Sequence, residues 1–152
     1  MKMELELFKK IPDWSLEPIF KESPPSVDAF LNSPLLILIF SLDCPGCIGR
    51  AIPYANRMVV EKGNELNVIG IHTNTDQCEY TPSDFQTAKE DLYIRFPFYK
   101  DHKSQTYLKY GAGGTPHWIL TDENGLVQYS IFGSDPNNAL MRLDYKMQEI
   151  FQ

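Results

Sequence analysis

The fold of this chain is decided by residues 35–47, whose sequence is LLILIFSLDCPGC. Its first six residues, 35–40, are all apolar, which is typical of a strand that is buried on both faces of a sheet. Cys44 and Cys47 follow at Cys-x-x-Cys spacing, and the pattern after them predicts a helix. The unpaired N–H groups and the positive dipole end at a helix start stabilise a thiolate. The order of strand, cysteine pair and helix therefore indicates thiol–disulfide chemistry.

Two other interpretations of the cysteine pair are a zinc site and a structural disulfide. A structural zinc ion needs four ligands, usually including a second Cys or His pair at similar spacing. The remaining candidates do not form such a pair: His72, Cys78, His102 and His117. A disulfide across two residues closes too small a loop to restrict the unfolded chain much. The sequence favours redox chemistry, with no metal and with no cofactor other than a redox-active Cys44–Cys47 disulfide.

Composition excludes several classes of function. The chain has 152 residues, of which 43% are hydrophobic and 22% charged, as in an ordinary globular domain. Its formal net charge of −6 does not favour binding to nucleic acid or to an anionic membrane. The longest apolar run, residues 35–40, is far too short to span a bilayer. With no repeat or linker, we expect a single domain over residues 1–152, with its core at about 11–150.

The first ten residues lack the pattern of a signal peptide, because acidic residues interrupt any apolar core and no small-residue cleavage site follows. We expect a cytoplasmic protein if Met1 is the native start, and a periplasmic or other extracytoplasmic protein if a leader was removed. Three cysteines in a cytosolic setting indicate reactive thiols more than a disulfide framework. Cys78 is interpreted as an accessible loop cysteine without a role, because nothing near it in sequence activates it. The alternative is a third redox position.

Strand and helix patterns alternate along the chain. Apolar patterning predicts strands at 35–40, 66–72, 118–121 and 126–132, and a short extended piece at 96–99. Helices are predicted at 26–31, 47–61, 83–93 and 102–110, with a last helix opening at 134–136. Pro53 predicts a kink in the second helix. Asn124-Gly125 between the last two strands is a strong hairpin signal.

Several motifs, in this order, resemble those of a known family. They are Pro12-Asp13-Trp14, residues 35–47, residues 96–101 (FPFYKD), residues 110–116 (YGAGGTP) and residues 118–125 (WILTDENG). With them the chain resembles the thioredoxin-like superfamily, and more closely its TlpA/ResA-type thiol–disulfide oxidoreductases, the AhpC/TSA-like or redoxin family. The resemblance covers most of residues 11–150. It implies an α/β, thioredoxin-like fold with a central mixed β-sheet and helices on both faces.

The resemblance also implies an activity, that of a protein-disulfide oxidoreductase in cell redox homeostasis. Cys44, accessible at the helix start, would attack a partner disulfide, and Cys47, one turn into the helix, would resolve the mixed disulfide. In this family the bond before Pro116 is cis, and the backbone of Thr115 would pair with the extended chain of the partner. The expected partners are protein thiols and disulfides and an upstream reductant or oxidant, with the net direction left open.

The chain departs from the family pattern at positions around the motif. Asp43 stands where tryptophan is usual, and its carboxylate would disfavour a thiolate on Cys44. The alternative is a solvated aspartate or one that caps the helix. Arg50 stands where a glutamate is common, which removes a candidate base and brings a cation near the helix face of Cys47. Leu38 aligns near the buried acid of thioredoxins and cannot move a proton.

Two histidines are further candidates for tuning the cysteines. His117 follows Pro116, and a protonated ring near the sulfurs would lower the pKa of a thiol. In the alternative interpretation its ring faces the other side of the sheet. His72 is interpreted as a strand-end histidine whose hydrogen bonds are satisfied.

Two other classes of function remain open. A peroxidase of peroxiredoxin type needs Pro-x-x-x-Thr/Ser-x-x-Cys, and here Ser41 fits whereas Ile37 does not. A thioredoxin-fold module that binds partners without turnover has no need of two cysteines. An insulin-reduction assay beside a peroxide-consumption assay would separate the three functions.

Overall fold

The computed structural model describes residues 5–74 and 79–151. Cys78 lies outside these residues, so neither interpretation of it is addressed by the structure. The strands are β1 (Leu16–Glu17), β2 (Leu35–Phe40), β3 (Asn67–His72), β4 (Phe98–Asp101), β5 (His117–Thr121) and β6 (Val127–Phe132). The α-helices are α1 (Ile52–Lys62), α2 (Pro82–Asp91), α3 (Gln105–Lys109) and α4 (Ala139–Ile150). Short turns of other helix types are η1 (Val27–Phe30), η2 (Cys47–Ala51) and η3 (His102–Ser104).

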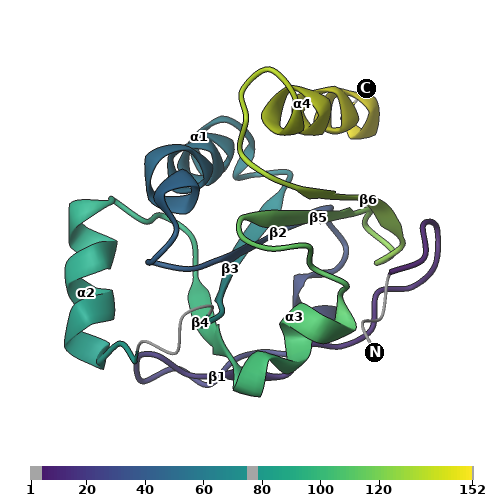
Figure 1. The fold of residues 1–152 in the computed structure, drawn as a ribbon. Coiled ribbons are helices and arrows are strands. Elements are labelled where there is room, and N and C mark those ends of the chain that lie inside the picture. Colours follow the sequence, from purple (N-terminus) through teal and green to yellow (C-terminus); the bar gives the residue numbers. More distant parts are fainter. Residues whose placement is uncertain (1–4, 75–78, 152) are drawn as a thin grey trace.

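The six strands form one mixed sheet in the order β1-β4-β3-β2-β5-β6 (Figure 1). β2 is parallel to β3 and antiparallel to β5, so it is paired on both sides. β3 is also parallel to β4, whereas β1 and β6 pair antiparallel at the two edges. Residues 35–40, predicted as a buried strand, therefore lie in the interior of the sheet.

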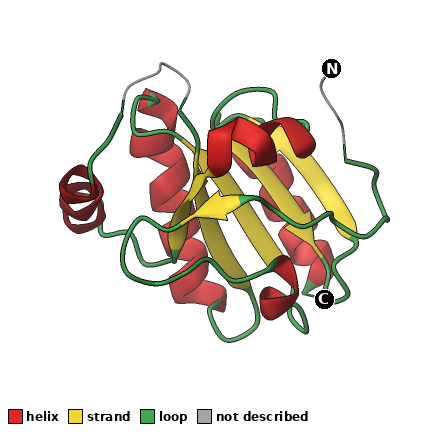
Figure 2. Ribbon diagram, turned by 90° about the horizontal axis from the view of Figure 1, so that it is seen from below, coloured by secondary structure: helices red, strands yellow, loops and turns green. Residues whose placement is uncertain are grey.

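Helices cover both faces of the sheet, as Figure 2 shows. All six residues of β2 are buried, and they alternate between two clusters of apolar side chains. The even-numbered residues face α1, α2 and α4, whereas the odd-numbered residues face η1 and α3. This arrangement explains why β2 is continuously apolar, since neither face of the strand meets water. The α/β class with helices on both faces is confirmed.

The helix predicted at 47–61 consists of two parts. Helical turns begin at Pro45, and the π-helical turn η2 precedes α1. The N–H of Ile52 donates to the carbonyl of Cys47, five residues earlier. Pro53 has no N–H with which to continue an α-helical ladder, so the wider turn lies directly before it. The distortion expected from Pro53 takes this form.

Several other elements differ from the prediction. Positive φ values at Lys103 and Ser104 interrupt the helix predicted at 102–110, leaving η3 and the short α3. The carboxylate of Asp101 accepts N–H groups of the α3 start, from Thr106 and Tyr107, at 2.8 and 3.0 Å. The last helix begins at Ala139, after a turn, and the two-residue strand β1 was not predicted.

Candidate active site

The Cys44 sulfur lies at the start of the helix that follows β2. Its Sγ accepts the N–H of Cys47 at 3.1 Å, and the Cys44 carbonyl accepts the N–H of Ile48 at 3.2 Å. Pro45 suits the first helical position, because its fixed φ is helical and the N–H it lacks would have no partner there. Cys44 and Cys47 are both free thiols in the structure. A sulfur held in this way faces the N–H groups and the positive dipole end that favour an anion.

The two thiols differ in their surroundings. Cys47 has no exposed surface, whereas Cys44 is half-buried. Burial raises the pKa of the Cys47 thiol well above its usual range, and the hydrogen bond with Cys44 raises it further. Cys47 therefore stays protonated at neutral pH.

The loop before β5 meets the cysteine pair, although about seventy residues of chain separate them. The Cys44 thiol donates to the carbonyl of Thr115 at 3.4 Å, and the Thr115–Pro116 bond is cis. A β-carbon at Gly46 would lie 3.9 Å from Cδ of Pro116. The predicted site residues Cys44, Cys47, Thr115 and Pro116 are thus brought together.

A third segment, between β6 and α4, closes the site, and the sequence analysis did not predict its place there. The N–H of Gly133 donates to the carbonyl of Pro116 at 2.8 Å. A β-carbon at Gly46 would lie only 2.8 Å from Oγ of Ser134, so a side chain there would require movement. Gly133 has a φ of 116°, a conformation that favours glycine. A glycine directly after the last strand was the one sequence feature that could have indicated this turn.

Asp43 is neither an isolated solvated carboxylate nor a helix cap. The hydroxyl of Tyr80 donates to its Oδ1, and the hydroxyl of Ser41 lies 3.4 Å from its Oδ2. The Asp43 N–H in turn donates to Ser41 Oγ at 3.2 Å. Asp43 therefore ties the loop that carries Cys44 to the segment before α2. Tyr80 gave no sequence signal, because nothing local indicates which loop it contacts.

His72 is buried directly behind this loop. Its Nε2 accepts the N–H of Leu42 at 3.1 Å, so the ring proton is on Nδ1. Burial lowers the pKa of His72 to about 4, and the nearby charge of Asp43 offsets part of that shift. A neutral, hydrogen-bonded ring agrees with the interpretation of His72 as a satisfied strand-end histidine.

The other two predicted modulators of the cysteines, His117 and Arg50, lie away from the Cys44 loop. His117 is paired with Ile39, on the face of the sheet opposite to the cluster that contains Cys47. Its ring contacts the N–H of Gly113 at 3.3 Å and Oγ of Ser130 at 2.8 Å. This placement agrees with the interpretation in which the ring faces away. Arg50 is exposed on η2. The pKa of Cys47 is set by burial of its thiol and by its contacts with Cys44, Ser41 and Thr115, and not by Arg50.

An open groove of about 600 Å³ starts beside the loop of residues 41–44, here called the redox loop, and runs along α2. Its lining is apolar and acidic: Leu42, Ile48, Glu79, Tyr80, Asp84, Thr87, Ala88, Asp91 and Leu92. Within residues 5–74 and 79–151, no three His, Cys, Asp or Glu side chains are grouped as metal ligands. In the same part of the chain, no helix is both long and apolar enough to cross a bilayer.

Most of the chain matches one known protein family. The model of the AhpC/TSA family matches residues 8–130, most of the chain. The chain belongs to the AhpC/TSA family. Curated relatives are two proteins called DipZ, from Mycobacterium bovis and Mycobacterium tuberculosis, each 28% identical over 132 residues. These residues make up 86% of this chain but only 19% of each relative, so the chain spans about a fifth of their length.

Solved structures at low sequence identity, one of them a thioredoxin-like superfamily protein, share the fold of this AhpC/TSA member. A putative thiol:disulfide interchange protein DsbE from Chlorobium tepidum superposes with a TM-score of 0.82 at 21% identity. The superposition covers 98% of this chain and all (100%) of that one. A thiol-disulfide isomerase from Corynebacterium glutamicum has a TM-score of 0.72 at 18% identity, covering 97% of both chains. The predicted thioredoxin-like fold is confirmed.

Proposed function

We propose that this protein is a thiol–disulfide oxidoreductase that exchanges two electrons with disulfides of partner proteins through Cys44 and Cys47. The observation that carries the proposal is the setting of the Cys44 sulfur. It accepts a helix N–H on one side and lies 3.4 Å from the Thr115 carbonyl on the other. Membership of the AhpC/TSA family and the names of the similar solved structures support the same chemistry.

The reaction takes place in two exchange steps. The Cys44 thiolate attacks one sulfur of the partner disulfide, whose S–S bond breaks, and the other partner sulfur leaves as a thiolate that takes up a proton. Cys47 then loses its proton and attacks the Cys44 sulfur, which forms the Cys44–Cys47 disulfide and releases the second partner thiol. Two electrons pass to the partner, and the reverse sequence oxidises it. An upstream dithiol or disulfide resets the pair.

The assignment of roles follows from burial. Cys47 is inaccessible and protonated at neutral pH, so it suits attack from within the protein once the mixed disulfide has formed. Cys44 is the half-buried thiol at the helix start. Thr115, whose carbonyl contacts the Cys44 sulfur, would accept an N–H of the partner backbone. The groove that begins at Leu42 and Ile48 offers adjoining space for the partner chain.

Trapping of a mixed disulfide tests both the function and the roles. Wild-type protein should reduce insulin catalytically with dithiothreitol as the reductant. The Cys47→Ser variant should accumulate a covalent complex with an insulin chain, whereas the matched Cys44→Ser variant should not, as seen on non-reducing gels. Brief treatment of the reduced protein with iodoacetamide at neutral pH should label Cys44 before Cys47 by mass spectrometry. Faster labelling of Cys47, or trapping by Cys44→Ser, would reverse the roles.

The same preparations separate the two other functions. Ile37 is fully buried in β2, where a peroxidase motif would have proline, and Ser41 contacts Asp43. We therefore expect little consumption of hydrogen peroxide. Peroxide turnover faster than insulin reduction would replace the proposal by a peroxidase. Absence of turnover in both assays would indicate a binding module.

A further inference from the structure

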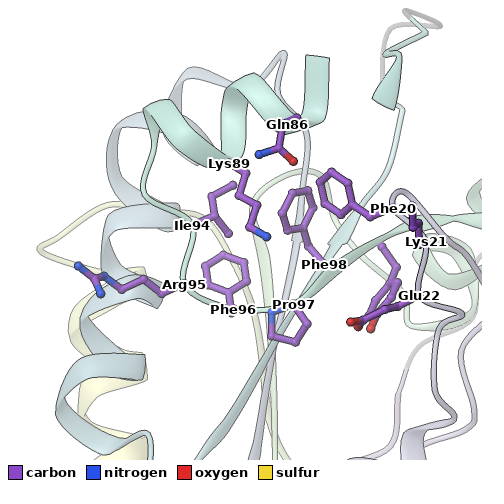
Figure 3. A pocket seen from close by; sticks show the side chains of 11 residues that line it. Phe20, Lys21, Glu22, Gln86, Lys89, Ile94, Arg95, Phe96, Pro97 and Phe98 are labelled. Carbon is purple, nitrogen blue, oxygen red and sulfur yellow. The ribbon is translucent and has the colours of Figure 1, made fainter. Parts of the chain in front are cut away.

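A hollow of about 490 Å³ lies where α2, the start of β4 and the segment after β1 meet, and none of the candidate site residues lines it (Figure 3). Its lining residues are Phe20, Lys21, Glu22, Gln86, Lys89, Ile94, Arg95, Phe96, Pro97, Phe98 and Tyr99. The volume is within the range of small-molecule sites in proteins. The proposed redox reaction does not use this hollow.

The floor of the hollow is aromatic and firmly packed. Phe96 and Phe98 are 3% and 4% exposed, and they rest against Gly70 of β3. A β-carbon at Gly70 would lie 2.8 Å from the Phe96 ring and 3.0 Å from Cβ of Phe98, so the glycine makes room for both. Phe20 closes the hollow from the segment after β1, with its ring edge-on to that of Phe98 at 5.6 Å. The floor is therefore preformed by three rings.

A cation without an acidic partner stands over this floor. Nζ of Lys89 lies 5.3 Å from the centroid of the Phe20 ring, and Figure 3 shows it directed among the aromatic rings. Among the described residues, neither Lys89 nor the other two basic residues of the rim, Lys21 and Arg95, forms an ion pair. The only carboxylate in the lining belongs to Glu22, which Figure 3 places on the side away from Arg95. The protein as a whole has a net charge of −6, whereas the lining of this hollow has three basic residues and one acidic residue.

We propose that the hollow binds an amphipathic anion, a small molecule with a flat apolar body and one acidic group. The apolar body would stack on the half-buried ring of Phe20, above the buried rings of Phe96 and Phe98, because offset and edge contacts between rings add to the effect of burial. The acidic group would pair with Lys89, which forms no ion pair with the described residues and whose Nζ lies over the Phe20 ring. A neutral or cationic molecule of the same shape would leave that charge without a partner.

Two fluorescent probes with nearly the same apolar body test the proposal. Anilinonaphthalene sulfonate carries an acidic group, and N-phenylnaphthylamine does not. With the full-length protein we expect saturable binding of one sulfonate probe per chain and weaker binding of the neutral probe. Lys89→Gln should weaken binding of the sulfonate probe by about two- to fivefold, as expected for loss of an exposed ion pair, and should leave the neutral probe unchanged. Phe20→Ala should weaken binding of both probes.

Lys9→Gln provides the matched control, because Lys9 is exposed near β6 and does not line the hollow. It should bind both probes as the wild type does. Thermal melts of all variants, read by circular dichroism, would exclude probe binding to partly unfolded chains. The proposal is overturned if the neutral probe binds as tightly as the sulfonate, if Lys89→Gln and Lys9→Gln behave alike, or if several sulfonate probes bind per chain. Because the readout is binding alone, it does not depend on the redox proposal.

Discussion

His72 holds the redox loop through a hydrogen bond, and its protonation should lower the stability of the protein. It is 2% exposed, its Nε2 holds the backbone N–H of Leu42, and its ring lies edge-on to Phe40, Tyr80 and Phe85. Protonation of Nε2 would remove this hydrogen bond and place a charge among aromatic rings. The chain before Cys44 is therefore held by a residue that must stay neutral.

The pH dependence of unfolding tests this role of His72. Its pKa is about 4 in the folded protein against 6.5 for a free histidine, so the unfolded chain binds the extra proton between these values. Stability from this group is complete above about pH 6.5 and is lost as the pH falls towards 4. Between about pH 7.5 and 4.5, the wild type should lose roughly 2–3 kcal/mol more unfolding free energy than His72→Gln, which cannot titrate there. Urea denaturation measures both, and parallel losses in the two proteins would contradict the assignment.

At the scale of elements, α2 joins both candidate sites, since it lines the groove beside the redox loop and carries Lys89 over the second hollow. Only Phe85 of this helix is buried, so packing contributes little of its stability. Its start is fixed by a capping box. Thr81 Oγ1 accepts the N–H of Asp84 at 3.1 Å, and Asp84 Oδ2 accepts the N–H of Thr81 at 2.8 Å.

Removal of the Thr81 hydroxyl should weaken α2. Thr81→Ala should lower the free energy of unfolding by about 1 kcal/mol, because the N–H of Asp84 loses its acceptor. Ser83→Ala, an exposed change one residue into the same helix after Pro82, is the control and should have little effect. Urea denaturation at neutral pH gives both values. Equal losses in the two variants would show that the cap is not the source of the effect.

At the scale of the whole molecule, the sheet places its most protected strand beside the proposed nucleophile, Cys44. β2 is paired on both sides and covered on both faces, and it leads directly into the loop of Cys44. The edge strands differ, since β1 has two residues and β6 is mostly half-exposed. Rigid support behind Cys44 keeps its sulfur near Thr115.

Amide hydrogen exchange should reproduce this order of protection. Amides of β2 and of the adjoining parts of β3 and β5 should exchange slowest, because local opening cannot expose them without disrupting both apolar clusters. Amides of β1 and β6 should exchange orders of magnitude faster. Exchange followed by NMR at neutral pH measures each amide. Exchange of β2 as fast as that of β6 would mean that the sheet is not the stable centre of the molecule.

Local patterns in the sequence were enough to predict most elements. The apolar run of β2, the cysteine pair at a helix start and the Asn124-Gly125 hairpin each depend on residues that are neighbours in the chain. The distortion of the helix before Pro53 was predicted only as a kink, because the choice of a π-helical turn depends on which carbonyl the N–H of Ile52 reaches. The interruption at Lys103 and Ser104 was missed, since positive φ at these residues has no sequence signature of the kind that glycine gives.

The sequence by itself determined the fold class and indicated Cys44 and Cys47 as the proposed redox pair, because burial pattern and Cys-x-x-Cys spacing are local properties. Only the tertiary structure decided what surrounds that pair. The contact of Cys44 with Thr115, the bond from Tyr80 to Asp43 and the face on which His117 lies all depend on strand register. In a sheet, a shift of one residue moves a side chain to the opposite face. The pairing of distant strands fixes that register, and no single stretch of this chain contains it.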